Sequence, residues 1–124
     1  MEGKSGYKVI FYESAAGRCP AEEFLESLPI KTRAKVAKWL EKLEEFGPDL
    51  PRPYADTLRD KIRELRVVFA SQHYRFLYFF YQKYIVVTHG FVKKASEVPE
   101  SEIEKARNIM LDFKERSERG EIEL

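Results

Sequence analysis

The chain has 124 residues, of which 44% are hydrophobic and 35% are charged. A chain of this length can bury a core of its own, so we expect one domain over residues 1–124, ordered over about residues 6–115 and ending in a charged tail. No apolar run is long enough to cross a bilayer, and the formal net charge of +1 gives no general attraction to nucleic acid. A site for a polyanion must therefore come from local clustering of basic residues.

The content of cysteine and histidine indicates a reducing compartment and no metal site. The single Cys19 cannot form a disulfide within the chain, and the N-terminal segment MEGKSGYK lacks the apolar core of a signal peptide. The two histidines and the one cysteine lie far apart, in no spacing typical of metal ligands. We therefore expect a cytoplasmic protein without a metal or another cofactor.

The first half of the chain predicts one strand followed by two helices. Residues 7–12, YKVIFY, alternate in the manner of a strand. Pro20 followed by acidic residues is typical of a helix start, and a longer helix is expected over residues 30–46, where apolar residues recur at helical spacing before a Gly-Pro pair. The proline-rich residues 47–60 are expected to form a connector across the surface.

The second half predicts three strands and a final helix. Residues 62–69, 74–81 and 84–90 are rich in aromatic and β-branched residues, and their connections are short enough only for antiparallel hairpins. A helix should begin at Pro99 and carry an apolar stripe made of Ile103, Ala106, Met110 and Phe113. The order β-α-α-β-β-β-α predicts an α+β fold, with two N-terminal helices packed on one face of a small, mostly antiparallel sheet and a C-terminal helix.

An arginine interrupts the aromatic stretch HYRFLYFFY of residues 73–81. If the preceding hairpin has an even-numbered loop, Arg75 faces Arg66 across the two strands. Such a pair requires either the neighbouring carboxylate of Glu64 or an open sheet face that receives an anion, and the arginine fork suits a phosphate. The second case predicts a sheet with one packed face and one recognition face, and the first predicts a structural ion pair.

Further candidate residues follow at the end of the last predicted strand. His89, Lys93 and Lys94 would add an imidazole and two cations near the arginines. The structural alternatives are a hydrogen-bonded histidine at a strand end and two solvated loop lysines. Tyr78 can stack on a base, although aromatic residues in strands usually pack in a core.

Three motifs in a fixed order carry a resemblance to a known family. They are E-L-R at residues 64–66, Y-R-F-L-Y at residues 74–78 and G-F-V-K-K at residues 90–94, followed by a helix that begins at Pro99. In this pattern the chain resembles the phage-related branch of the RelE/HigB toxin superfamily. The resemblance covers about residues 7–113 and implies a RelE-like fold.

The resemblance implies the toxin of a type II toxin–antitoxin pair, an endoribonuclease that cuts mRNA on the ribosome without a metal. In this reaction a ribose 2′-OH attacks the adjacent phosphate and leaves a 2′,3′-cyclic phosphate. The motif makes Arg66 and Arg75 the phosphate-binding, charge-stabilising groups, with Lys93 in the same site; the residues expected to contact substrate are Lys94, Glu64 and Tyr78. The implied partners are mRNA, the ribosome and a small helix-turn-helix antitoxin encoded next to the toxin.

One departure from the family pattern leaves the proton-transfer residue open. Some members have a tyrosine shortly after the basic residue of the last strand, where this chain has Pro99. His89 is the first candidate for proton transfer because an imidazole titrates near neutrality, and Lys93 is the second. Two other functions remain open: a non-catalytic RNA- or ribosome-binding domain, and a protein-interaction module whose sheet face receives a partner helix.

Overall fold

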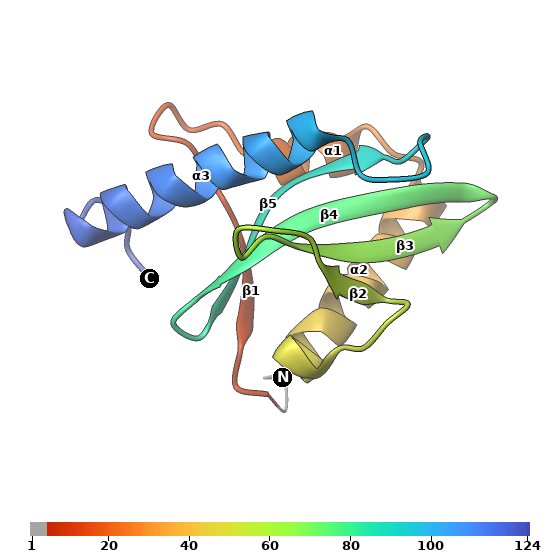
Figure 1. Ribbon diagram of the computed structural model, residues 1–124, viewed down its shortest axis with the longest axis horizontal. Coiled ribbons are helices and arrows are strands. Elements are labelled where there is room, and N and C mark those ends of the chain that lie inside the picture. Colours follow the sequence, from red (N-terminus) through yellow and green to blue (C-terminus); the bar gives the residue numbers. More distant parts are fainter. Residues whose placement is uncertain (1–4) are drawn as a thin grey trace.

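The computed structural model describes residues 5–124, so the first four residues of the N-terminal segment discussed above lie outside it. The α+β class and the expected order of helices and long strands are confirmed (Figure 1). The elements are β1 (Lys8–Phe11), α1 (Pro20–Glu26), α2 (Ile30–Phe46), the 3-10 turn η1 (Gly47–Asp49), β2 (Ala55–Thr57), β3 (Arg63–Phe69), β4 (Gln72–Tyr81), β5 (Tyr84–Val92) and α3 (Glu100–Glu118). Within residues 5–124, none of the helices combines the length and apolar composition that a membrane crossing needs.

The strands form one five-stranded sheet in the order β1-β5-β4-β3-β2. β1 pairs with β5 in parallel, and the other neighbours are antiparallel. β2 was not predicted, because it lies in the segment expected to be only a connector. Its three residues are too few to show an alternating pattern, and they form a strand by pairing with residues 63–65 of β3.

The hairpin between β3 and β4 fixes the register on which the site depends. Ala70 and Ser71 form a two-residue turn, and both have positive φ values, of 51° and 65°. Such mirror-image turns match the twist of a hairpin, and they usually contain Asn-Gly, which this chain lacks. The loop has an even number of residues, which was the condition for Arg75 to face Arg66, and Arg66 lies directly opposite Arg75.

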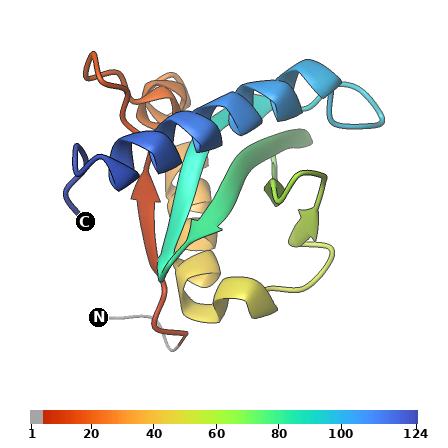
Figure 2. The ribbon, with the colours of Figure 1, turned by 60° about the vertical axis from the view of Figure 1, so that its left-hand side comes forward.

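Helices cover both faces of the sheet (Figure 2). The face turned toward α1 and α2 buries a cluster that includes Leu65, Phe76 and Tyr78. The opposite face buries Leu77 and other residues against α3, through the predicted stripe of Ala106, Met110 and Phe113 with Ile103 also buried. The expectation of one open recognition face is therefore wrong: α3 covers that face, and only its end, beyond the start of α3, is left for a site.

Gly90 explains part of the G-F-V-K-K motif. A Cβ atom at this position would lie 2.6 Å from ring atoms of both Phe24 on α1 and Phe76 on β4. No side chain fits at that distance. The glycine therefore lets α1 pack closely against β5, just before the chain enters the loop that carries Lys93.

The last helix extends a few residues into the charged tail that was expected to follow about residue 115. α3 continues to Glu118. Arg116 is only 8% exposed, and its guanidinium donates hydrogen bonds to the backbone oxygen of Glu13 at 2.6 Å and to Asp112 at 3.0 Å. The hydroxyl of Tyr12 donates to the same Asp112 carboxylate at 2.6 Å. These contacts tie the last turns of α3 to the segment after β1.

Candidate functional site

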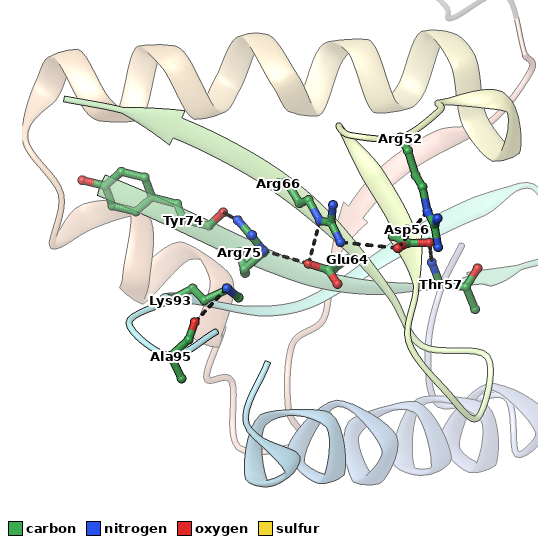
Figure 3. Close-up of polar contacts among 9 residues, drawn as sticks. All are labelled: Arg52, Asp56, Thr57, Glu64, Arg66, Tyr74, Arg75, Lys93 and Ala95. Carbon is green, nitrogen blue, oxygen red and sulfur yellow. Dashed lines mark hydrogen bonds and ion pairs between the residues drawn. The ribbon is translucent and has the colours of Figure 1, made fainter. Parts of the chain in front are cut away.

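A pocket of about 540 Å³ lies at the uncovered end of the sheet, between β2, β3 and β4 and the loop that leads into α3. Four of the residues expected at the site from the sequence line it together: Glu64, Arg66, Arg75 and Lys93. Figure 3 shows these side chains between the sheet and the start of α3. The convergence expected from the motifs is therefore present for these four residues.

Arg75 forms the structural ion pair that the sequence left open, and it also lines the pocket. Its Nε lies 2.7 Å from Oε1 of Glu64, and the two residues are 6% and 3% exposed. The Nε–H does not point at the carboxylate, so the contact is an ion pair without hydrogen-bond geometry, while Nη1 donates to the backbone oxygen of Tyr74 at 3.2 Å. Burial lowers the pKa of Arg75, and the Glu64 charge opposes this shift.

A chain of alternating charges extends from this pair to the sheet edge (Figure 3). Arg66 donates from Nε to Glu64 at 3.1 Å and from Nη2 to Asp56 at 3.4 Å. Asp56 also lies 3.1 Å from Nε of Arg52, and hydrogen bonding to Arg52 lowers the pKa of Asp56. Three guanidiniums thus share two carboxylates, which leaves one positive charge in excess. Arg66 is the accessible guanidinium of the Arg66–Arg75 pair, with 31% of its side chain exposed.

The two lysines of the motif differ in position. Lys93 lines the pocket, its backbone N–H donates to the His73 oxygen at 2.7 Å, and its Nζ donates to the Ala95 oxygen at 2.8 Å. The backbone bond continues the pairing of β4 and β5 by one residue and holds Lys93 beside the arginines. Lys94 is exposed and is not part of the pocket wall.

The structure does not bring His89 to the pocket. The side chain is 2% exposed and lies under α3, with Nε2 2.9 Å from Oε1 of Glu102 and Nδ1 2.9 Å from Oγ1 of Thr88. Burial lowers the pKa of His89, and its contact with Glu102 opposes this shift. Both ring nitrogens have partners within the fold, which matches the alternative of a hydrogen-bonded strand-end histidine.

Tyr78 is also away from the pocket. It is fully buried in the core beneath α1 and α2, because it alternates with Leu77 and Phe79, which face α3. Its hydroxyl has no hydrogen-bond partner within residues 5–124. Burial raises the pKa of Tyr78, and the nearby guanidinium of Arg63 opposes this shift. Its position is that of a packed core aromatic.

Asp56 and Arg59 are among the pocket residues that were not predicted from the sequence. Asp56 lies on β2 directly opposite Glu64, so recognition of the short strand would have placed it beside Arg66. Arg59, in the β2–β3 connection, forms ion pairs with Glu100 and, at 3.7 Å, with Glu104. These contacts tie the start of α3 to the β2–β3 connection and close one side of the pocket.

The α+β fold, with a mostly antiparallel five-stranded sheet and helices before and after it, is consistent with the RelE-like class of fold. Within this class, the family model described as "Phage derived protein Gp49-like (DUF891)" matches residues 23–111, which is more than half of the chain. The chain therefore belongs to the Gp49-like family, a member of the RelE/HigB-like group of toxin–antitoxin toxins. A comparison with curated proteins finds no match.

Proposed function

We propose that the chain is the toxin of a type II toxin–antitoxin pair and an endoribonuclease that cleaves mRNA on the ribosome, in the cytoplasm and without a metal ion. One observation carries the proposal: Arg66 and Arg75 lie opposite each other on neighbouring strands and line one pocket with Lys93. Guanidinium groups present several N–H donors in a plane and bind phosphate oxygens in pairs. This arrangement suits a phosphodiester.

The proposed reaction is attack of a ribose 2′ oxygen on the adjacent phosphorus. The 2′ proton leaves to a base, the bond from phosphorus to the 5′ oxygen breaks, and that oxygen leaves with a proton. The products are a 2′,3′-cyclic phosphate and a 5′-OH. Arg66 and Arg75 stabilise the charge that builds on the phosphorane oxygens. Of the two candidates for proton transfer, only Lys93 lines the pocket, and we assign to it proton donation to the leaving oxygen.

The two arginines have different parts in this proposal. Arg75 is buried against Glu64 and serves as a fixed positive charge. Arg66 is partly exposed, and its contact with Asp56, at 3.4 Å, is long for a charged pair. A phosphate entering the pocket can replace Asp56 as its partner, while Glu64 keeps both guanidiniums oriented. Glu64 thus acts through the arginines as a positioning residue.

The test is cleavage of mRNA by the purified protein, with and without ribosomes. We expect new 5′-OH ends and 2′,3′-cyclic phosphate ends, and cleavage that excess EDTA leaves unchanged. Activity lost with EDTA and restored by Mg²⁺ contradicts the metal-free reaction. RNA that is bound but left intact supports the non-catalytic RNA-binding alternative instead.

We propose as partner an antitoxin encoded next to this chain, a small helix-turn-helix protein with an acidic segment that covers the pocket. The partly exposed guanidinium of Arg66, which lines the pocket, supports an acidic partner. Co-expression should give one complex at low salt, weakened as salt is raised. Elution of the two proteins as separate species at low salt contradicts this pairing.

A further inference from the structure

A second pocket, of about 400 Å³, adjoins the first, and Arg66 and Arg75 line both. The rest of its wall is more apolar than that of the first pocket, although Lys35 and His73 also line it. It includes the aromatic rings of Trp39 and Tyr54 and the side chain of Val68. The proposed phosphate site thus has an apolar and aromatic pocket directly beside it.

The aromatic wall is held in place by contacts within the fold. The rings of Tyr54 and Trp39 stack with centroids 4.6 Å apart and an interplanar angle of 22°. The backbone oxygen of Tyr54 accepts a hydrogen bond from the N–H of Arg66 at 2.8 Å. This bond ties the loop to β3 at Arg66, which lines both pockets, so Tyr54 shares the second pocket with the two arginines. Tyr54 is nevertheless 41% exposed, which leaves part of its ring free for a ligand.

The register of the β3–β4 hairpin fixes the distance between this second pocket and the two arginines. Val68 lies opposite His73, two residues along the strands from the Arg66–Arg75 pair and on the same sheet face. Two residues along a strand span about 7 Å, a separation comparable with that between a phosphate and the base of one nucleotide. Val68 is 52% exposed and extends the apolar surface beside Tyr54.

We propose that the second pocket binds one unpaired nucleobase of the RNA whose phosphate contacts Arg66 and Arg75. The inference rests on the proposed function and narrows its substrate to single-stranded RNA, because a paired base has its faces covered by stacked neighbours. Stacking on an aromatic ring accepts any base, since every base has a π face. Tyr54 is therefore a substrate-binding residue that favours unpaired nucleotides without selecting a sequence.

The experiment uses two oligonucleotides that cannot be cleaved, because every 2′ oxygen is methylated. One is an eight-nucleotide adenine strand, and the other has the same backbone without bases. Trp39 is the chain's only tryptophan, so its fluorescence reports binding at this pocket. We expect the strand with bases to quench Trp39 and the strand without bases to bind without quenching.

Variants separate the base contact from the phosphate contact. Tyr54→Ala should lower the affinity for the oligonucleotide with bases about 5-fold to 100-fold and leave the affinity for the oligonucleotide without bases unchanged. Tyr54→Phe keeps the ring and should bind like wild type. Phe46→Ala, which removes an equally exposed ring (43%) outside the pocket, is the matched control. Urea unfolding of each variant verifies that it is folded.

The outcomes distinguish the two proposals. If wild type binds both strands equally and Tyr54→Ala changes neither affinity, the base pocket is refuted while RNA binding stands. If wild type binds neither strand and Arg66→Ala has no effect on either, the proposed function is refuted and the base pocket with it. Both proposals are supported if Arg66→Ala lowers the affinity for the two oligonucleotides by the same factor and Tyr54→Ala lowers only the affinity for the oligonucleotide with bases.

Discussion

Replacing Arg66 by alanine separates the proposed chemistry from the stability of the fold. The substitution removes a guanidinium that is partly exposed and that contacts Asp56 at 3.4 Å and Glu64 at 3.1 Å. The contact with Asp56 is partly exposed and contributes about 0.2–1 kcal/mol to stability. Glu64 is buried and keeps its ion pair with Arg75 at 2.7 Å, but it loses the hydrogen bond from Arg66. We therefore expect a loss of about 1–2 kcal/mol of folding free energy.

The effect of Arg66→Ala on cleavage should be far larger. Removal of one preorganised donor from a site that stabilises a charged transition state costs about 100-fold to 1000-fold in rate. Arg75→Ala is a weaker test, because it breaks a pair whose members are 6% and 3% exposed. Loss of a buried ion-pair partner costs about 3–5 kcal/mol. This is a large part of the total free energy of unfolding of a typical domain, which is about 5–15 kcal/mol. Arg66 stays beside Glu64, so we expect the cost to lie at the lower end of the first of these ranges.

The assay combines urea unfolding with quantified mRNA cleavage for Arg66→Ala, Arg75→Ala and the control Arg52→Ala. Arg52 contacts the same Asp56 carboxylate at 3.1 Å, but its side chain is 77% exposed and does not line the pocket. The control should keep both stability and activity. The reasoning is refuted if Arg66→Ala cleaves mRNA at the wild-type rate, or if its urea midpoint falls as far as that of Arg75→Ala.

Three further predictions test the remaining residues. Tyr78→Phe removes a buried hydroxyl without a partner in the described chain, so urea unfolding should show about 1–3 kcal/mol of added stability and cleavage should not change. Burial lowers the pKa of His89 from the ordinary 6.5, so below that pH the unfolded chain takes up a proton that the folded chain resists. Stability should therefore fall as pH drops through 6.5. The difference in unfolding free energy between pH 5 and pH 7, measured by urea unfolding, should be smaller in His89→Gln than in wild type. An equal difference contradicts this, because the contact with Glu102 would then offset the effect of burial on the pKa of His89. Lys93→Ala should lower the cleavage rate about 100-fold or more while Lys94→Ala leaves it unchanged, and equal rates for the two variants contradict the assigned proton donor.

The arginine pair could be predicted from the sequence because it depends on two simple rules. Side chains alternate along a strand, and an even-numbered hairpin loop fixes which residues lie opposite each other. With these rules the sequence places Arg66 opposite Arg75, and Glu64 on the same face as Arg66, as the structure has them. The same alternation gives Tyr78 the face opposite Arg75, where the structure places it in a core.

The rest of the site required information that local patterns do not contain. Asp56 belongs to a strand of three residues, whose pairing with β3 depends on the fold rather than on a periodic pattern. The sheet face that α3 covers could not be predicted either, because an apolar stripe shows that a helix packs against the sheet but not on which face. The open face inferred from the arginines is in fact a pocket, bounded on one side by the contacts of Arg59 with Glu100.

A single irregularity in β5 decides which side chains join Arg75. Tyr78 pairs with Val87 and Leu77 pairs with His89, so Thr88 is an extra residue without an opposite partner on β4. Thr88 is fully buried, and its hydroxyl donates to the Leu77 oxygen at 3.2 Å, which fixes the bulge. Because side chains alternate, one inserted residue moves every later side chain to the other face. Without it, Lys93 would follow the alternation of Val87 into the core beneath α1 and α2; with it, Lys93 lines the pocket of the arginines. The bulge therefore brings Lys93 to the pocket that Arg66 and Arg75 line, where we propose that phosphate binds, and the same shift turns His89 toward α3.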